Sequence, residues 1–491
     1  MSLVQRHAEA VSVLPEGRML IGGEWVQGST GSTMQHCDPS TGRPLPAFAT
    51  ADTSDVDAAV DNAAKAFESW RHTPANERRR LLLRIAERIR AHEDELATIM
   101  ALETGGPVGR PVMGVMADNL EYFAGWADKC AGELVQVYPR RSLDYVRYEP
   151  LGVIAALTPY NVPFLSAVIK LAPALATGNT VVIRPPETGP FGVVRIGELL
   201  LDAGVPPGVV NVVLGGPDVG EALVRHPSIS KISFTGGPVV ARKILAAAAE
   251  NLTPAVLELG GKSANIVFED ADLDDPGFAQ TVLMVIGTAG QGCVYGTRLL
   301  VQESIYSKVV DRVLELAKVG VMGDPLDSRT TIGPVINERA VERILGAIGG
   351  GAGGSDARVI LGGARADGEL ADGFFVEPTV VVDVDNSSVL AQEEVFGPVL
   401  AVTPFSTERQ AVELANATQF GLHGYIHTRD LKRAHRVAED LAVGGVSINT
   451  VPPFTPNAPF GGVRGSGYGR EGGLAGVLEY VSLKNVNVPL D

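Results

Sequence analysis

The chain has 491 residues, with 57 Asp and Glu against 41 Lys and Arg, and a formal net charge of −16. This length exceeds what one hydrophobic core usually supports, so two or three domains are expected. An acidic chain lacks the basic face that nucleic acid requires, and its apolar runs are far shorter than the roughly 20 residues of a membrane span. We therefore expect neither a nucleic-acid partner nor a membrane partner.

The cysteines are few and widely separated, at Cys37, Cys130 and Cys293. That spacing suits neither a disulfide framework nor a zinc site, so no bound metal is predicted. The N-terminal residues contain no apolar segment typical of a secretory signal. These features predict a cytoplasmic protein.

Helical periodicity dominates the first third of the chain. Apolar residues recur at helical spacing in three segments, 54–70, 77–98 and 115–130. Ser54 is the expected N-cap of the first helix. Alternating residues then predict a hairpin at 134–148, and a strand at 478–488 that pairs with it in the same or a neighbouring subunit. Such a projecting ribbon predicts a homodimer or homotetramer.

From residue 151 onward, short apolar strands alternate with helices. Strands are expected at 152–157, 180–183, 209–214, 231–234 and around Ala255. This order predicts a doubly wound parallel sheet, whose ligands bind beyond the carboxyl ends of the strands. A second α/β pattern follows, with strands expected at 297–301, 379–384, 398–405 and 445–449.

A carboxylate and a thiol stand out in the middle of the chain. Glu258 ends an apolar strand, and Cys293 follows a glycine-rich turn. A carboxylate near a turn-borne thiol suits covalent catalysis, although a lone cysteine is often only a small buried hydrophobe. The closest histidines in sequence, His226 and His423, are distant, so a Cys-His dyad has no local support. Activation by a helix N-terminus or nearby dipoles is favoured.

Several glycine-rich segments resemble nucleotide-binding motifs. The GxGxxG strings at 349–354 and 467–472 do not join a strand to a helix, so they are rejected as dinucleotide fingerprints. The segment 234–237 (Phe-Thr-Gly-Gly) is better placed to present N–H groups to a pyrophosphate, or it is simply a tight turn. Arg184 and Glu187 follow a strand where an acidic group can bind a ribose, or they form a solvated strand end. Gly261-Lys262-Ser263 lacks the first glycine of a P-loop.

Six motifs occur in one order along the chain. They are Thr158-Pro159-Tyr160-Asn161, Phe234-Thr235-Gly236-Gly237, Leu257-Glu258-Leu259-Gly260-Gly261-Lys262-Ser263, Gly290-Gln291-Gly292-Cys293, Glu393-Glu394-Val395-Phe396-Gly397-Pro398 and Pro459-Phe460-Gly461-Gly462. Each is modest alone, but together they resemble the aldehyde dehydrogenase superfamily over nearly the whole chain.

The resemblance implies NAD(P)-dependent, non-acylating oxidation of an aldehyde to the carboxylic acid. Cys293 would attack the aldehyde, and the Asn161 amide and the Cys293 N–H would hold the oxyanion. Loss of hydride would leave a thioester, which water activated by Glu258 would hydrolyse. Lys170 and Glu471 match positions associated with proton transfer.

The resemblance also implies cofactor contacts, with Glu394 on the nicotinamide ribose and Phe396 beside the ring. The positions are Leu157, Thr158, Pro159, Tyr160, Arg184, Glu187, Gly216, Gly220, Phe234, Thr235, Gly236, Gly237, Val240, Leu259, Gly260, Glu394 and Phe396. Glu187 would repel a 2′-phosphate, which favours NAD over NADP. Arg184, Tyr160 and Gly237 replace the family's commoner lysine, tryptophan and serine. Cys293 follows Glu258 by 35 positions, one more than is usual in the family.

Matching positions imply the substrate pocket. They are Tyr122, Val162, Leu165, Ile169, Gly292, Val294, Phe454 and Phe460. The loop at 451–459 carries no charge, which predicts an uncharged, apolar or aromatic aldehyde. Two alternatives stay open, a relative that transfers the acyl group to coenzyme A and an inactive binding protein on the same fold. The presence of Glu258 argues against the first, and Cys293, Glu258 and Asn161 together argue against the second.

The predicted fold class is α/β, with a doubly wound parallel-sheet cofactor domain, a second α/β catalytic domain and a small β oligomerisation element. Residues 1–131 and 151–260 are assigned to the dinucleotide-binding domain, and residues 261–473 to the catalytic domain. The oligomerisation hairpin and C-terminal strand are assigned to 132–150 and 474–491.

Overall fold

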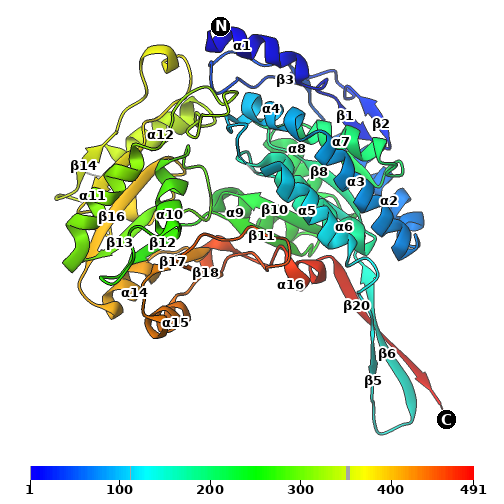
Figure 1. The fold of residues 1–491 in the computed structure, drawn as a ribbon. Helices are drawn as coiled ribbons and strands as arrows, with labels where there is room; N and C mark the ends of the chain where they lie inside the picture. The colour runs from blue at the N-terminus through cyan, green and yellow to red at the C-terminus, as the bar shows by residue number, and fades with distance from the viewer. Residues whose placement is uncertain (1, 111, 350–353, 491) are drawn as a thin grey trace.

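The computed structural model describes residues 2–110, 112–349 and 354–490. Two lobes, each built around a mixed sheet covered by helices, lie side by side, and a thin ribbon projects from the first lobe (Figure 1). The predicted α/β fold class is confirmed. No helix in the described ranges has both the length and the apolar character needed to cross a bilayer.

The N-terminal region supplies helices to the first lobe, the strands β1 and β2 at one end of its sheet, and a separate small sheet of β3 and β4. Its elements are α1 (Leu3–Ala10), η1 (Val11–Val13), β1 (Met19–Ile21), β2 (Glu24–Val26), β3 (Thr33–Met34), β4 (Phe48–Ala49), α2 (Thr53–Trp70), α3 (Ala75–Ala91), α4 (Glu93–Thr104) and α5 (Val112–Ala124). The single helix predicted at 77–98 is wrong, because the backbone leaves helical geometry at His92 and starts α4. The N-cap of α2 is Asp52 rather than Ser54, since the Asp52 side chain accepts from the Asp55 N–H.

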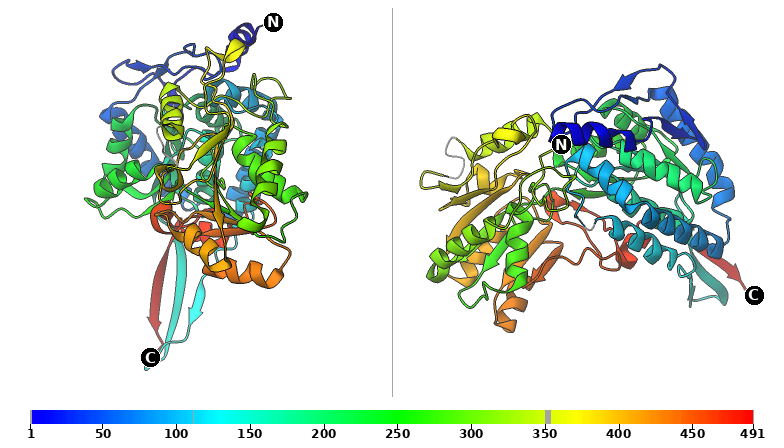
Figure 2. Two further views of the ribbon diagram at one scale, coloured as in Figure 1. Left: turned by 90° about the vertical axis from the view of Figure 1, so that its left-hand side faces the viewer. Right: turned by 45° about the horizontal axis from the view of Figure 1, so that its top comes forward.

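The first lobe is organised by an eight-stranded sheet in the order β19-β11-β10-β7-β8-β9-β1-β2. Its further strands are β7 (Val153–Leu157), β8 (Thr180–Arg184), β9 (Val210–Val212), β10 (Ile229–Gly236), β11 (Ala255–Leu259) and β19 (Gly467–Tyr468); its helices are α6 (Pro163–Thr177), α7 (Phe191–Asp202), α8 (Pro217–Arg225) and α9 (Pro238–Ala248). Strands β7 to β11 are mutually parallel, and β19 joins β11 antiparallel. Helices on both faces bury these strands, which explains their continuous apolar sequences (Figure 2).

The second lobe contains a seven-stranded sheet in the order β14-β15-β16-β13-β12-β17-β18. The strands are β12 (Ala264–Val267), β13 (Arg298–Gln302), β14 (Arg358–Leu361), β15 (Thr379–Val382), β16 (Val399–Phe405), β17 (His423–His427) and β18 (Gly445–Ile448); the helices are α10 (Pro276–Ile286), η2 (Glu303–Ile305), α11 (Tyr306–Ala317), α12 (Glu338–Ile348), η3 (Gly368–Leu370), α13 (Val389–Gln392), α14 (Glu408–Asn416), α15 (Leu431–Asp440) and η4 (Arg464–Ser466). Among the strands that the structure describes in this sheet, only β14 is antiparallel to its neighbour. The predictions missed β12, β14 and β17.

The projecting ribbon is a three-stranded sheet of β5 (Glu133–Val135), β6 (Ser142–Pro150) and β20 (Val481–Pro489). Strand β20 follows the helix α16 (Gly473–Leu478) in the chain. Strand β20 runs antiparallel to β6 from Val481 opposite Pro150 to Pro489 opposite Ser142. The predicted hairpin and its pairing with the C-terminal strand are confirmed, within one chain. Leu134, Tyr138 and Leu483 are exposed on the ribbon, and assembly through it stays a prediction.

Candidate active site

Glu258 lies on β11, near the carboxyl end of that strand and between β10 and β19. Its side chain is 3% exposed, and neither carboxylate oxygen has a hydrogen-bond partner among the described residues. Burial, and next the charge of Glu471, raise the pKa of Glu258 well above its usual value, while Lys170 and Arg470 act in the opposite direction. The structure therefore contains a buried carboxyl group that no described side chain engages, and in its ionised form it can accept a proton from a small molecule.

Cys293 lies on a turn that follows α10. The turn is closely packed, because a Cβ on Gly290 would come within 2.1 Å of the Gly397 backbone. The Tyr425 hydroxyl donates to the Val294 carbonyl at 2.9 Å and fixes the chain just after the thiol. Burial and the charges of Glu394 and Glu258 raise the pKa of Cys293 to about 12, against the lowering effect of two backbone N–H groups, those of Cys293 and Val294.

Asn161 lies just before α6, and the fold brings it to the cysteine turn. Its Nδ2 donates to the Gln291 carbonyl at 2.9 Å. The Gln291 side chain in turn accepts from the Ile336 N–H at 3.1 Å. The predicted neighbours Asn161 and Cys293 therefore come together from the two lobes, and one of the two amide N–H bonds of Asn161 is left for another acceptor.

Lys170 and Glu471 form a buried ion pair beneath the first sheet. The Lys170 ammonium is fully buried and lies 2.7 Å from Glu471 Oε1. Backbone hydrogen bonds of 2.6 and 2.8 Å join Glu471 to Phe460. Gly461, the next residue, lies so close to Glu258 that a Cβ there would come within 2.7 Å of Oε1. The structure thus places this pair next to the Glu258 carboxylate, and its role in proton transfer stays a prediction.

Glu394 approaches the glycines that follow β11. Its Oε1 accepts from the Gly261 N–H at 3.0 Å, and a Cβ on Gly260 would come within 2.0 Å of Oε2, so only glycine fits there. Burial raises the pKa of Glu394 to about 7. The Phe396 ring meets the Tyr160 ring edge-on, with centroids 5.7 Å apart.

The remaining cofactor candidates lie at the carboxyl ends of β7, β8 and β10. Arg184 donates through Nη2 to Glu187 at 2.9 Å and to the Gly215 carbonyl at 2.6 Å. Gly220, in the first turns of α8, packs towards Leu157 and Arg184. Leu259 and Thr158 are buried, and Pro159 continues the loop after β7.

The segment 234–237 ends β10 and begins α9, as predicted, with Gly237 as the N-cap. A Cβ on Gly237 would meet nothing within 4 Å, and Val240 on the first turn is 49% exposed. Gly216 caps α8 in the same way. Two neighbouring helix N-termini therefore face an open, partly apolar surface, which suits a phosphate-bearing ligand with a flat ring.

Most of the proposed substrate-pocket residues are apolar side chains that are partly exposed to solvent. Val162, Leu165 and Ile169 are partly exposed on one side of α6, whose other positions are buried. Phe460 packs on the cluster that contains Cys293, and Phe454 is 50% exposed. Tyr122 packs edge-on against Trp126.

Val294 and Gly292 lie differently from the other pocket candidates. The Val294 side chain is buried in the core of the second lobe, so it does not line an open pocket. Gly292 has no room for a side chain, because a Cβ there would come within 2.4 Å of the Tyr295 ring.

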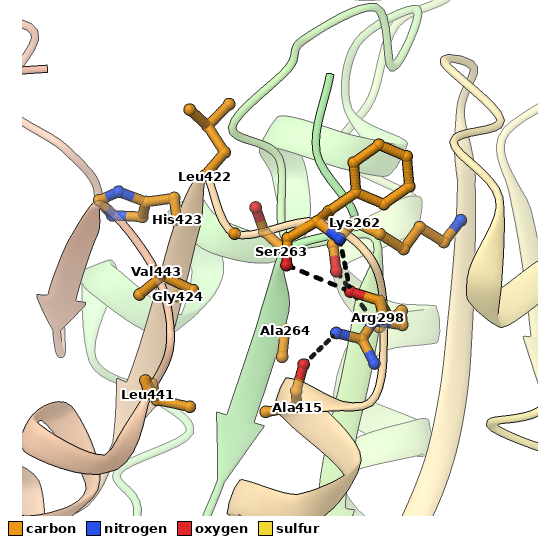
Figure 3. Close-up of a pocket in the computed structure, with 13 residues that line it drawn as sticks. Lys262, Ser263, Ala264, Arg298, Ala415, Leu422, His423, Gly424, Leu441 and Val443 are labelled. Carbon is orange, nitrogen blue, oxygen red and sulfur yellow. Dashed lines mark hydrogen bonds between the residues drawn. The ribbon is translucent and has the colours of Figure 1, made fainter. Parts of the chain in front are cut away.

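A separate small cavity lies in the second lobe (Figure 3). Arg298 lines it and donates to backbone carbonyls of Lys262, Leu414 and Ala415. Its volume of about 10 Å³ admits a single water molecule at most. Elsewhere in the described ranges, no group of three His, Cys, Asp or Glu side chains has the geometry of a metal site.

Comparison with known proteins identifies the family of this chain. Residues 25–486 match the model of the aldehyde dehydrogenase family. The chain belongs to the aldehyde dehydrogenase family. It is 40% identical over 481 residues to the phenylacetaldehyde dehydrogenase of Pseudomonas fluorescens, which covers 96% of this chain and 95% of that protein. It is 39% identical over 477 residues to a betaine aldehyde dehydrogenase of Cereibacter sphaeroides, covering 96% and 97%.

The fold of this aldehyde dehydrogenase family member also resembles that of a solved structure. The betaine aldehyde dehydrogenase of Staphylococcus aureus in complex with NAD⁺ superposes with a TM-score of 0.95 and 36% identity, covering 99% of this chain and 98% of that one. The resemblance inferred from six motifs is confirmed at the level of the family.

Sequence reasoning missed several polar residues around the site. Tyr425 contacts the backbone of the cysteine turn, Ser233 contacts Lys170, and Tyr480 contacts Ser233. Tyr425 and Tyr480 lie outside the six motifs, whereas Ser233 directly precedes the 234–237 segment. Ser233 and Thr235 alternate on β10, which was a usable signal that both face one side of the sheet.

Proposed function

We propose that this enzyme oxidises uncharged, apolar or aromatic aldehydes to carboxylic acids, with NAD as the acceptor. The carrying observation is the Asn161 hydrogen bond to Gln291, which holds an amide donor beside Cys293 while the buried Glu258 has no hydrogen-bond partner among the described residues. A nucleophile, an oxyanion donor and an unengaged base are the groups that two-step acyl chemistry needs.

In the first step the Cys293 thiol loses its proton to solvent, the resulting thiolate attacks the aldehyde carbon, and the carbonyl electrons move to oxygen. The two backbone N–H groups near sulfur stabilise the thiolate, and the free N–H of Asn161 holds the oxyanion. NAD, held at its nicotinamide ribose by Glu394, would supply the hydride acceptor, so that the carbon bonded to Cys293 would be left as a thioester. Glu258 then accepts a proton from water as the water oxygen attacks the thioester, and the acid departs with the thiolate restored.

Several features of the described residues support NAD as the cofactor. Gly237 borders open space, Val240 offers an exposed apolar surface, and Thr158 Oγ1 is buried without a hydrogen-bond partner in the described ranges. Glu187 lies beside Arg184, so an added 2′-phosphate would meet a negative charge. Glu394 would hold the nicotinamide ribose.

The substrate class follows from the partly exposed apolar side of α6 and from Phe460 and Phe454, together with the uncharged 451–459 loop. The phenylacetaldehyde dehydrogenase relative supports an aromatic aldehyde. We include in the proposal a cytoplasmic homodimer or homotetramer assembled through the ribbon.

The test is an aldehyde panel of phenylacetaldehyde, hexanal, betaine aldehyde and succinate semialdehyde, each with NAD and with NADP. We expect phenylacetaldehyde and hexanal to give the highest kcat/KM, with free acid as product in the absence of coenzyme A. A preference for succinate semialdehyde would contradict the substrate class, and a requirement for coenzyme A would contradict the hydrolytic step.

A further inference from the structure

The Lys170 ammonium uses all three of its donors inside the protein. It donates to Ser233 Oγ at 3.1 Å, to Thr235 Oγ1 at 2.8 Å and to Glu471 Oε1 at 2.7 Å. Ser233 and Thr235 are two positions apart on β10 and so face the same side, towards α6, which carries Lys170. A fully buried ammonium is tolerated only with such complete bonding.

Tyr480 extends this group from the opposite end of the chain. Its hydroxyl donates to Ser233 Oγ at 3.3 Å, and its side chain is 3% exposed. Its backbone carbonyl accepts from Asn179 Nδ2 at 2.8 Å, so the residue is held at both ends. No hydrogen bond among the described residues joins Ser233 or Tyr480 to the cysteine turn, whereas Ser233 contacts Lys170 directly and Tyr480 contacts Ser233.

We propose that Ser233 and Tyr480 are positioning residues for hydrolysis of the thioester, because their hydroxyls hold the Lys170 ammonium against Glu471, beside the base Glu258. This inference rests on the proposed function. The link to the base is structural, through the Glu471–Phe460 backbone pairing and the contact of Gly461 with the Glu258 carboxylate.

The charges around Glu258 determine how the pKa of this residue responds when Lys170 is displaced. Glu471 and Glu479 raise the pKa of Glu258 along with burial, and Lys170 and Arg470 lower it. Lys231, on β10, forms an ion pair with Glu479, one of the two acidic residues that raise the pKa of Glu258. Without the Tyr480 hydroxyl, Ser233 is free to rotate and Lys170 loses a fixed acceptor, so its charge stabilises the Glu258 carboxylate less. The pKa of Glu258 then rises further.

The experiment compares Tyr480→Phe and Ser233→Ala with a matched control, Ser166→Ala. Ser166 is buried on the same helix as Lys170, but its hydroxyl has no hydrogen-bond partner among the described residues. The infrared band of the protonated Glu258 carboxyl, assigned by its loss in Glu258→Gln, is titrated in each protein. The pH dependence of kcat and the KM values for aldehyde and NAD are measured in parallel.

We expect the Glu258 midpoint to rise by about half a unit to one unit in both variants, a fraction of what a nearby opposite charge can contribute. The acid limb of kcat should move in the same direction, with KM values within about twofold of the parent and no change in Ser166→Ala. An unchanged Glu258 midpoint in folded Tyr480→Phe and Ser233→Ala proteins would overturn the inference. The same holds if these variants lose thermal stability while the midpoint stays unchanged, because that result would indicate a purely structural role. The infrared titration needs no turnover, so a parent enzyme inactive on aldehydes would refute the proposed function separately.

Discussion

The side-chain amide of Asn161 donates a 2.9 Å hydrogen bond to the backbone carbonyl of Gln291, two positions before Cys293. Asn161 belongs to the loop after β7, and Gln291 belongs to the second lobe. One N–H of the Asn161 amide is thus held by the Gln291 carbonyl. The orientation of the amide is therefore already set, and its second N–H can donate to a nearby oxyanion without a further loss of side-chain freedom. Such preorganisation is where oxyanion donors obtain their effect.

Replacing Asn161 by Ala should lower kcat/KM for a good aldehyde by about 10² to 10³-fold, the usual effect of removing one oxyanion donor. The rate at which iodoacetamide alkylates Cys293 should change little, because the amide does not contact the thiol in the resting structure. Steady-state kinetics and alkylation rates check this. Equal losses in both would indicate a collapsed turn rather than a lost donor.

Replacing Glu258 by Gln should trap the acyl-enzyme. We expect one equivalent of NADH to form rapidly, followed by turnover slower by about 10² to 10⁴-fold, since a general base is lost. Mass spectrometry of the intact protein should show the acyl mass, which disappears in Cys293→Ala. Rapid steady turnover in Glu258→Gln would exclude Glu258 as the base.

The raised pKa of Glu258 gives the hydrolysis step a defined pH dependence. Only the ionised carboxylate accepts a proton, so single-turnover hydrolysis of the thioester should accelerate as pH rises through that pKa. In Glu258→Gln the same rate should depend much less on pH. Rapid-mixing measurements of acid release at several pH values test this, and a parent rate that falls with pH would contradict it.

The Arg184–Glu187 pair bears on cofactor choice. Glu187 binds Arg184 at 2.9 Å and places a negative charge where a 2′-phosphate would approach. Glu187→Gln should raise the NADP-to-NAD ratio of kcat/KM by about tenfold, the equivalent of roughly 1.4 kcal/mol. Glu221→Gln, which removes an exposed carboxylate on α8, is the control and should leave the ratio unchanged.

His7, on α1, forms hydrogen bonds with both lobes. Its Nδ1 lies 2.7 Å from Asp38 Oδ2, and its Nε2 lies 2.9 Å from Asp324 Oδ1. Burial lowers the pKa of His7, but the hydrogen bonds to Asp324 and Asp38 outweigh burial and raise the pKa to about 9. A raised folded pKa means that this stabilisation is complete below about pH 6.5 and is lost as pH rises through about 9.

His7→Gln should therefore lower Tm by on the order of a few degrees at pH 6.5, and the difference should vanish near pH 10. Thermal-shift curves across this range provide the measurement. Arg6→Ala serves as the control, because its pair with Asp324 is 41% exposed on the arginine side and contributes little. A Tm difference that persists at pH 10 would show that packing, not charge, is responsible.

The motifs and the pattern of strands and helices predicted the family, the fold class and the neighbourhood of Asn161, Glu258 and Cys293. Strand β17 escaped prediction because His423 and His427 interrupt its apolar pattern, although both are buried in the sheet. The Ser233–Tyr480 contact joins positions 247 apart, and no local pattern encodes such a pairing. Local signals determine elements, whereas long-range polar contacts appear only when the chain is folded.

The wide separation in sequence between Ser233 and Tyr480 has a consequence for the order in which the first lobe is completed during synthesis. Strands β7 to β11 precede β19, Glu471 and Tyr480 by the whole second lobe, yet β19 pairs with β11, and Glu471 and Tyr480 complete the environment of Lys170. Because chains begin to fold from the N-terminus while they are being made, the buried lysine must wait until the segment that contains Glu471 and Tyr480 has been made before its hydrogen bonds are complete. A chain truncated before residue 480 should therefore hold its cofactor lobe in an unfinished state.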